Sequence, residues 1–479
     1  RNPHDLPRSA SHDTMTTTNQ LIVVANRLPV RRVQDADGQR WVTSPGGLVS
    51  ALSPVITERP NATWVGWTGA AGRPPDPFEL DGLQLHPVEL TRADVQLYYE
   101  GFSNGTIWPL YHDAIAQPDY HRTWWDAYVK VNRRFADQVL ALAEPDATVW
   151  IHDYQLQLVP GMLRQVMPQL DIGFFFHIPF PARELYLRLP WRTEVVRALL
   201  GADLIGFQTD VMAHNFRHVV PRLIDDHDLE IDGETIHFGG RQVTAKTHPI
   251  GIDYQRFADA AADPSVEGAV EELRETLNHP LTVILGVDRL DYTKGIDRRL
   301  RAYGELLDED RISADDTVLI QIAEPSRTNV TGYADIRSEV EQLVGEINGN
   351  FGTMGRPAVH YLHRSHSFEE LIALYRLADV MLVTPFRDGM NLVAKEYVAT
   401  RHDLTGTIVL SEFAGAAHEL NQAVLVNPYD IDGLKEAIEF AVFMSPDDQR
   451  ARMTTMRDAV ASNSAQHWAT TFIAELEGS

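Results

Sequence analysis

Short apolar runs alternate with longer amphipathic segments along most of the chain. The apolar runs predict buried strands, and apolar residues at helical spacing predict helices between them. Strands that alternate with helices are typical of an α/β fold with parallel sheets. The clearest strand candidates are residues 21–25, 148–151, 171–176, 281–286, 317–322 and 379–383, and the clearest helix candidates are residues 124–143, 210–224, 296–307, 333–347, 368–377 and 392–400.

The chain is long for a single hydrophobic core. Its 479 residues predict two or three domains. We interpret residues 248–253 as a hinge, and therefore expect Rossmann-like domains over residues 21–248 and 249–455, with a last segment over residues 456–479. Residues 1–20 are polar and lack an apolar signal core, so they are predicted to form a disordered tail.

Composition and charge restrict the ligands. Apolar residues make up 44% of the chain, as in globular proteins, and the net charge of −25 argues against a surface for nucleic acid or anionic membrane. Cysteine is absent, which excludes disulfides, cysteine nucleophiles and thiolate metal sites and fits a cytoplasmic protein. No apolar run approaches the length of a membrane span. We expect small-molecule substrates, without nucleic-acid or membrane partners.

One stretch, residues 384–396, combines a strand end, a glycine-containing turn and a helix start. In an open α/β sheet, ligands bind beyond the carboxyl ends of the strands, and a helix start attracts an anionic diphosphate. A carboxylate is a good acceptor for sugar hydroxyls. We therefore interpret Asp388 as a hexose ligand and Glu396 as a ribose ligand, with an ordinary strand-to-helix turn as the alternative.

Polar residues also follow three strand candidates of the first domain. Arg27, Asp153 and His177 each stand where an apolar run ends, and on parallel neighbours they would face one crevice. Gly46 and Gly47 precede a predicted helix and would allow a phosphate to approach the backbone, although a plain turn is the simpler interpretation of a glycine pair.

Two further segments carry candidate chemistry. Residues 98–110 place four aromatic rings in what we predict to be a glycine-broken loop, either as satellite core or as a wall for a sugar. Arg289, Lys294 and Arg327 follow strands of the second domain. Such cations are commonly solvated, but together they can neutralise a diphosphate leaving group without a metal.

In combination, these motifs resemble those of the trehalose-6-phosphate synthases, the retaining glycosyltransferases of family 20. The resemblance runs from about residue 21 to the C-terminus. It implies the GT-B fold, in which two Rossmann-like domains face each other across a cleft, and a final helix within residues 456–479 that crosses back to the first domain. The motifs that carry it are residues 26–29, 46–48, Tyr99 with Trp108, 150–154, 176–181, 289–295 and 388–396.

The resemblance also implies roles for individual residues. The acceptor, glucose 6-phosphate, would be held by Arg27, Tyr99, Trp108, Asp153 and Arg327. The catalytic set would be Asp153, His177, Arg289, Lys294 and Asp388. The nucleotide sugar would be held by Gly46, Gly47, Arg289, Lys294, Asp388, Gly389, Met390, Asn391, Leu392, Val393 and Glu396, with His177 beside the donor glucose.

The implied reaction moves glucose from a nucleotide sugar to the anomeric hydroxyl of glucose 6-phosphate, with retention and by front-face attack. It needs neither a carboxylate nucleophile nor a metal or other cofactor. We also expect a homo-oligomer, a dimer or a tetramer, although the sequence alone does not fix this state. Residue types around His366 differ from the family's base-binding loop, so UDP-, ADP- and GDP-glucose all stay open as donors.

Three other functions compete with this interpretation. A related transferase would use another acceptor, such as glycerol 3-phosphate or fructose 6-phosphate, but the acceptor residues Arg27, Tyr99, Trp108 and Arg327 favour a hexose phosphate. A non-catalytic sensor of sugar phosphates has no evident need for Arg289, Lys294, Asp388 and Glu396 together. A fused phosphatase is not expected, because the tail contains no Asp-x-Asp opening.

Overall fold

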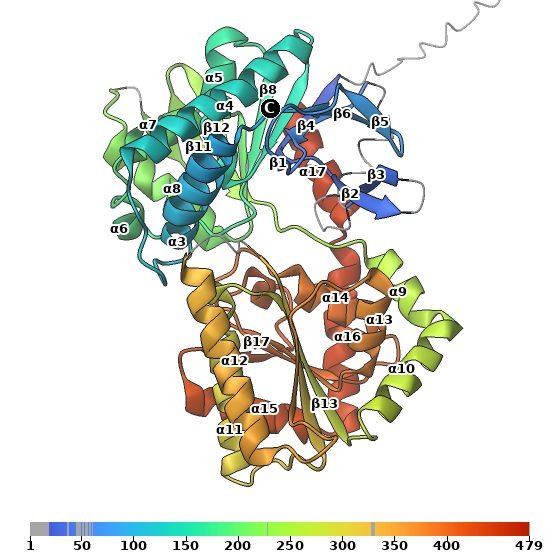
Figure 1. The fold of residues 1–479 in the computed structure, drawn as a ribbon. Coiled ribbons are helices and arrows are strands. Elements are labelled where there is room, and N and C mark those ends of the chain that lie inside the picture. Colours follow the sequence, from blue (N-terminus) through green and yellow to red (C-terminus); the bar gives the residue numbers. More distant parts are fainter. Residues whose placement is uncertain are drawn as a thin grey trace, which may run out of the picture.

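The computed structural model describes residues 19–35, 38–44, 49, 52, 56, 59, 61–227, 229–326 and 331–478. Within these residues the chain forms two α/β parts, each built around its own sheet (Figure 1). The predicted α/β class is confirmed.

The first part contains a ten-stranded sheet in the order β10-β11-β12-β9-β8-β7-β1-β4-β6-β5. Its strands run parallel from β12 to β6, and antiparallel pairs close both edges. The strands are β1 (Leu21–Arg27), β4 (Thr63–Trp67), β5 (Phe78–Leu80), β6 (Leu83–Pro87), β7 (Thr148–His152), β8 (Asp171–Phe175), β9 (Leu204–Phe207), β10 (Glu230–Asp232), β11 (Thr235–Phe238) and β12 (Arg241–Thr247), with a separate hairpin of β2 (Val30–Asp35) and β3 (Gly38–Thr43). The helices are α2 (Arg92–Asp94), η1 (Val95–Ile107), α3 (Trp108–Tyr111), α4 (Arg122–Leu142), η2 (Tyr154–Leu156), α5 (Val159–Val166), α6 (Arg183–Tyr186), α7 (Arg192–Leu199) and α8 (Asp210–Leu223).

The second part contains a six-stranded, entirely parallel sheet in the order β15-β14-β13-β16-β17-β18. Its strands are β13 (Thr282–Arg289), β14 (Thr317–Glu324), β15 (Val359–Leu362), β16 (Val380–Val383), β17 (Thr407–Ser411) and β18 (Val424–Val426). The helices are α9 (Tyr254–Ala262), α10 (Pro264–Thr276), η3 (Tyr292–Lys294), α11 (Ile296–Asp308), α12 (Thr331–Phe351), α13 (Phe368–Leu377), α14 (Leu392–Thr400), η4 (Gly415–His418), α15 (Ile431–Val442), α16 (Pro446–Ser462) and α17 (Ala465–Glu477).

Strand register brings the candidate residues to one edge of each sheet. In the first sheet, Ala25 of β1 lies opposite His152 of β7, which lies opposite Phe175 of β8. In the second sheet, Arg289 of β13 lies opposite Glu324 of β14. The loops that follow these strands therefore leave each sheet together, as parallel pairing requires.

Two connections between the parts run side by side. The chain passes down through residues 248–253 and returns where α16 ends, and Ile252 pairs with Ser464 at that point. A Cβ on Gly251 would lie 1.9 Å from the Asn463 carbonyl oxygen, so the two connections touch through their backbones. The buried ammonium of Lys395 donates to the Ile250 carbonyl at 2.8 Å and fixes α14 to the same place.

Helix α17 lies on the first sheet, although α16 belongs to the second part (Figure 1). The ring of Phe472 stacks on Trp150 of β7 at 4.6 Å. A Cβ on Gly173 or Gly206 would lie within 2.8 Å of that same phenyl ring, so these strand glycines make room for the helix. Arg59 and Glu477 form a double hydrogen bond at the far end of α17.

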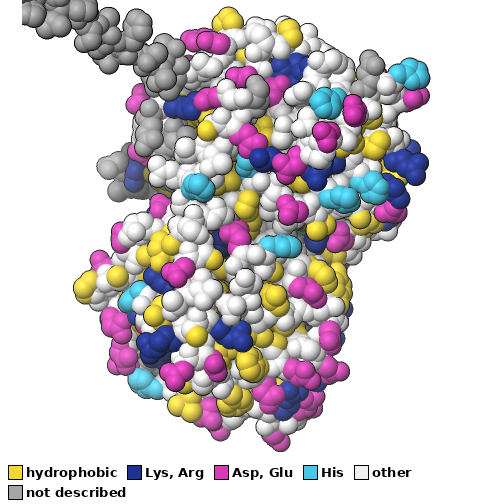
Figure 2. Space-filling view, turned by 180° about the vertical axis from the view of Figure 1, so that it is seen from behind, with side chains coloured by type: hydrophobic (Ala, Val, Ile, Leu, Met, Phe, Trp, Pro, Cys, Tyr) yellow, Lys and Arg dark blue, Asp and Glu magenta, His cyan; other side chains and the backbone are white. Residues whose placement is uncertain are grey.

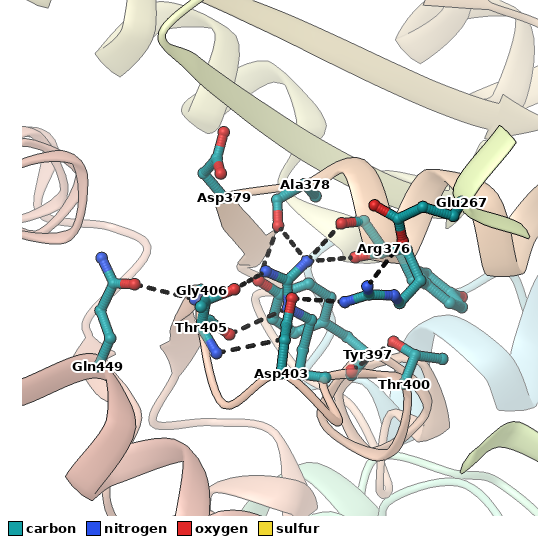
Figure 3. Close-up of polar contacts among 12 residues, drawn as sticks. Glu267, Arg376, Ala378, Asp379, Tyr397, Thr400, Asp403, Thr405, Gly406 and Gln449 are labelled. Atoms are coloured by element: carbon teal, nitrogen blue, oxygen red, sulfur yellow. Dashed lines mark hydrogen bonds and ion pairs between the residues drawn. The ribbon is translucent and has the colours of Figure 1, made fainter. Parts of the chain in front are cut away.

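A polar network fixes the end of α14 that lies away from its first residue (Figure 3). Arg376 pairs with Asp403 at 2.5 Å in the loop between α14 and β17. In the same loop, the Gly406 N–H donates to the Gln449 side chain at 3.0 Å. This loop is therefore attached to both α13 and α16, and these contacts fix the position of the C-terminal end of α14.

One prediction about local structure is wrong, and one helix was not predicted. Residues 98–110 are helical, in η1 and α3, instead of forming a loop. A Cβ on Gly101 or Gly105 would lie 2.8 or 3.0 Å from the Trp124 ring, so these glycines serve close packing against α4 and do not break the chain. Helix α16 was not foreseen, since it buries few apolar side chains, Met453, Met456 and Val460 among them.

On the face in Figure 2, the described Lys and Arg side chains are interspersed with Asp and Glu side chains over both parts. None of the helices in the described part of the chain has the length and apolar character needed to cross a membrane.

Candidate active site

Arg27 and Tyr99 meet at the end of β1. The Arg27 guanidinium lies over the Trp67 ring, 5.0 Å from its centroid, and the Tyr99 ring meets the same indole edge-on at 5.6 Å. Gly69 adopts φ +91°, and a Cβ there would lie 2.1 Å from Arg27 Nη2. A glycine at position 69 therefore leaves room for the Arg27 guanidinium.

Asp153 follows β7 in a backbone conformation that is rare for a residue with a side chain, with φ 74°. Its carboxylate accepts a hydrogen bond from the backbone N–H of His177 at 3.1 Å, and its own N–H donates to the Phe175 carbonyl at 2.8 Å. The loops after β7 and β8 are thus joined, and the strained conformation is held by both bonds.

His177 is paired with a second histidine. Its Nε2 lies 3.1 Å from Nδ1 of the buried His152, the last residue of β7. Burial lowers the pKa of His177 to about 3. Burial and the neighbouring His177 lower the pKa of His152 well below its ordinary value. Both imidazoles are therefore neutral at physiological pH.

Lys294 and Asp388 form an ion pair at 2.5 Å. Burial raises the pKa of Asp388, but the Lys294 ammonium more than reverses this, so its pKa lies below the ordinary value. Asn391 donates to the same carboxylate oxygen at 3.1 Å. The buried guanidinium of Arg299 donates to the Lys294 carbonyl at 3.0 Å, which fixes the loop from below.

The loop from Asp388 to Asn391 approaches the first part closely. A Cβ on Gly389 would lie 2.0 Å from the His177 carbonyl oxygen, so only glycine fits between the two loops. Asn391 has φ 73°, and α14 begins directly after it. The Met390 carbonyl accepts from the Ala416 N–H at 2.8 Å. The first N–H groups of α14 therefore start beside the Lys294 and Asp388 pair.

Glu396 lies one turn further along α14, and its carboxylate accepts from the Tyr375 hydroxyl at 2.9 Å. Burial raises its pKa to about 7, although the Tyr375 hydroxyl acts in the opposite direction. In the absence of a ligand this carboxyl group is partly protonated near neutral pH.

We expect this raised pKa to make stability depend on pH. Between the ordinary value of 4.5 and about 7, the unfolded chain loses the Glu396 proton while the folded chain keeps it. The contribution of Glu396 to the free energy of unfolding should therefore fall as pH rises, by up to about 1.4 kcal/mol per pH unit, and level off above about pH 7. The buried imidazoles of His112, His152 and His177, whose pKa values are lowered, contribute in the opposite direction. Denaturant unfolding between pH 4.5 and 8 measures this slope.

The Glu396→Gln variant lacks this contribution, because it has no proton to lose, so its slope of unfolding free energy against pH should be more positive than that of the wild type in that range. Tyr375→Phe is the matched variant: without the hydroxyl, the carboxyl pKa should rise further and the falling range should extend to higher pH. Equal slopes in the wild type and Glu396→Gln would contradict the prediction.

Two further contacts join the two parts. The Arg289 guanidinium lies over the Trp108 ring, 5.6 Å from its centroid, and Arg387 pairs with Asp113 at 3.4 Å. Trp108 belongs to α3 of the first part, whereas Arg289 ends β13 of the second. These contacts place the proposed acceptor residue Trp108 beside the proposed diphosphate residue Arg289.

His112 is a site neighbour that the sequence did not reveal. Its ring lies 4.0 Å from the Trp108 ring, and its Nδ1 lies 2.8 Å from the Trp108 carbonyl. A carbonyl only accepts, so Nδ1 carries the proton and Nε2 is an acceptor. Burial lowers the pKa of His112 to about 4, although the hydrogen bond to the Trp108 carbonyl and the carboxylates of Asp291 and Asp388 act in the opposite direction. The spacing of four residues from Trp108 was the available signal, and the wrong loop prediction concealed it.

The predicted site residues thus form linked groups along the edges where the two parts meet. Leu392 and Val393 open α14, half-buried. Gly46, Gly47 and Arg327 lie outside the described residues. Among the residues that the structure describes, no group of three or more His, Asp or Glu side chains could hold a metal ion. The residues joined by the contacts above are Trp108, Asp153, His177, Arg289, Lys294, Asp388, Gly389 and Asn391.

Two α/β parts whose strand ends face each other, together with the likeness to solved trehalose-6-phosphate synthases, define a glycosyltransferase of the GT-B fold. The chain belongs to glycosyltransferase family 20, whose sequence model matches residues 19–478. The family prediction is confirmed.

The curated relatives and solved structures agree on one kind of enzyme. The trehalose-6-phosphate synthase of Mycolicibacterium smegmatis is 52% identical over 474 residues, 98% of this chain and 94% of that protein. An α,α-trehalose-phosphate synthase (UDP-forming) from Burkholderia xenovorans, in complex with glucose-6-phosphate, is 35% identical with a TM-score of 0.87 and covers 96% of this chain and 100% of its own. The Escherichia coli enzyme bound with UDP-2-fluoro glucose is 34% identical with a TM-score of 0.87 and covers 96% and 99%.

Proposed function

We propose that the protein transfers glucose from a nucleotide sugar to glucose 6-phosphate with retention, forming α,α-trehalose 6-phosphate. The observation that carries this proposal is the Lys294 and Asp388 ion pair next to Gly389, which packs against the His177 backbone of the other part, in a chain that is 52% identical to a trehalose-6-phosphate synthase. The relatives solved with glucose-6-phosphate and with UDP-2-fluoro glucose support the two substrate classes.

On the donor side, Arg289 and Lys294 would neutralise the diphosphate, with the start of α14 beside them. Lys294 then shares its ammonium between Asp388 and the phosphate, which leaves Asp388 free to accept from a glucose hydroxyl. Glu396 would accept from the ribose hydroxyls. The hexose would thus be held by Asp388, just before α14, and the nucleoside by Glu396, one turn into that helix.

On the acceptor side, Arg27, Tyr99, Trp108 and Asp153 would hold glucose 6-phosphate, with Arg327 as the further phosphate ligand that the sequence suggests. As the bond between the anomeric carbon and the phosphate oxygen breaks, the acceptor oxygen bonds to that carbon on the same face. Its proton passes to the departing phosphate oxygen. With a pKa of about 3, His177 stays neutral at physiological pH, so it positions substrate and does not act as a general acid.

Independence of metals, a dimeric or tetrameric assembly and a cytoplasmic location stay predictions. The donor nucleobase also stays open among uracil, adenine and guanine. The main alternative is a related transferase that uses another phosphorylated acceptor. The two functions differ in the acceptor that nucleotide release requires.

The deciding experiment measures nucleotide release from UDP-, ADP- and GDP-glucose in EDTA, with product identification by NMR. We expect release that depends on glucose 6-phosphate and yields the α,α-linked product with at least one donor. Glycerol 3-phosphate and fructose 6-phosphate serve as control acceptors and should give only background release. Preference for a control acceptor would overturn the substrate assignment, and tight glucose 6-phosphate binding without release from any donor would favour a sensor.

A further inference from the structure

Among the residues that the structure describes, His177 is the site residue that the His152 side chain faces. It ends β7, one residue before Asp153, and its side chain is buried. Its ring lies 4.7 Å from the Trp150 ring and 6.4 Å from Trp468 of α17. Its Nδ1 faces Nε2 of His177 at 3.1 Å. The ring is therefore held in place by aromatic neighbours, and one of its nitrogens is directed at a site residue.

A single proton must lie between these two nitrogens. Both rings are neutral, so each carries one N–H and one lone pair. Nε2 of His152 is buried and has no hydrogen-bond partner among the residues that the structure describes. If His177 donated to His152 Nδ1, the His152 proton would have to lie on Nε2, and this buried N–H would have no acceptor. If His152 donates from Nδ1, its Nε2 carries only a lone pair, and no N–H is left without an acceptor.

Buried N–H groups without a partner are rarer in proteins than under-satisfied acceptors. Such an N–H group loses its hydration on burial and gains no hydrogen bond in return. The arrangement in which His152 Nδ1–H donates to His177 Nε2 is therefore favoured. His177 must then carry its own proton on Nδ1.

We propose that His152 is a positioning residue that fixes His177 as the Nδ1–H tautomer, so that His177 offers a donor, and not an acceptor, to an oxygen of the bound sugar. The role of the sugar rests on the proposed function, whereas the tautomer belongs to the protein alone. Trp468 of α17 holds both sides of this pair in place, because its ring lies 6.1 Å from His177 and 4.9 Å from Phe175, the last residue of β8.

Three substitutions at His152 separate the hydrogen bond from packing. His152→Leu keeps an apolar side chain but cannot donate, and we expect kcat to fall about 10–100-fold, as for other lost orienting bonds, with the KM for glucose 6-phosphate nearly unchanged. His152→Asn can place an amide N–H where Nδ1 was, so kcat should stay near the wild-type value. His152→Asp can only accept when ionised, which forces the opposite tautomer on His177 and favours its protonated form, so kcat should fall and acquire a new dependence on pH between about 5 and 8.

Trp150→Phe is the matched control, because it alters the packing on His152 without touching Nδ1, and its kinetic constants should stay close to those of the wild type. Thermal unfolding of each variant checks that it folds. Wild-type kcat and pH profile in His152→Leu, or equal losses in His152→Leu and His152→Asn, would overturn the proposal.

Neutron diffraction of the unliganded wild-type protein tests the tautomer without any variant. A proton on His152 Nδ1 and another on His177 Nδ1 is the expected result. A proton on His152 Nε2 would overturn the inference. This measurement needs no turnover, so it distinguishes a failure of the tautomer assignment from a failure of the proposed reaction.

Discussion

Replacing Asp388 with alanine is expected to lower the turnover number by roughly 10²-fold or more, a loss of the size seen when one preorganised electrostatic contact is removed from an active site. The substitution removes the partner that lies 2.5 Å from the Lys294 ammonium and the acceptor of the Asn391 side chain. It also removes the proposed acceptor for a glucose hydroxyl. Nucleotide binding should change little, because Glu396 and the start of α14 remain.

Steady-state kinetics with the donor that the wild type prefers, together with calorimetric binding of the free nucleotide, measure the two effects separately. Asp388→Asn keeps the shape and loses the charge, so its turnover should lie between those of the wild type and Asp388→Ala. Asp335→Ala, on the exposed face of α12, is the matched control and should behave as the wild type. Full turnover in Asp388→Ala, or a loss of nucleotide affinity as large as the loss of turnover, would contradict the assignment.

The sequence predicted elements best where local signals agree. Residues 368–377 and 392–400 were predicted as helices, and α13 and α14 have those same bounds. At α13, Ser367 and Glu370 form a capping box, so a local sequence motif determines where the helix begins. The strand register also places the polar residues after β1, β7 and β8 at one edge of the sheet, as parallel pairing predicts.

Contacts between the two parts could not be predicted in this way. The Arg289 and Trp108 pair and the approach of Gly389 to His177 depend on how two separately folded sheets are placed relative to each other. Local periodicity carries no information about that placement. His112 was missed for a related reason, since its position depends on η1 and α3 being helical, and glycines in residues 98–110 suggested a loop.

The approach of the two parts yields the second large prediction. Gly389→Ala is expected to reduce kcat/KM by about 10²-fold or more, because displacement of reacting groups by about 1 Å can cost that much. The added Cβ would lie 2.0 Å from the His177 carbonyl oxygen and 3.1 Å from the Ile178 Cα. Both are backbone atoms, so no side-chain rotation relieves the overlap, and the loops that carry His177 and Asp388 must separate.

Gly268→Ala is the matched control. Gly268 lies within α10, where a Cβ meets nothing within 4 Å, so alanine should leave turnover unchanged and raise stability by about 0.5–1 kcal/mol. Steady-state kinetics and thermal unfolding of both variants separate a general effect of replacing glycine from a specific effect at the cleft. Wild-type kcat/KM in Gly389→Ala would mean that the two loops need not approach each other during the reaction. The proposal that His177 and Asp388 act on one sugar would then be wrong.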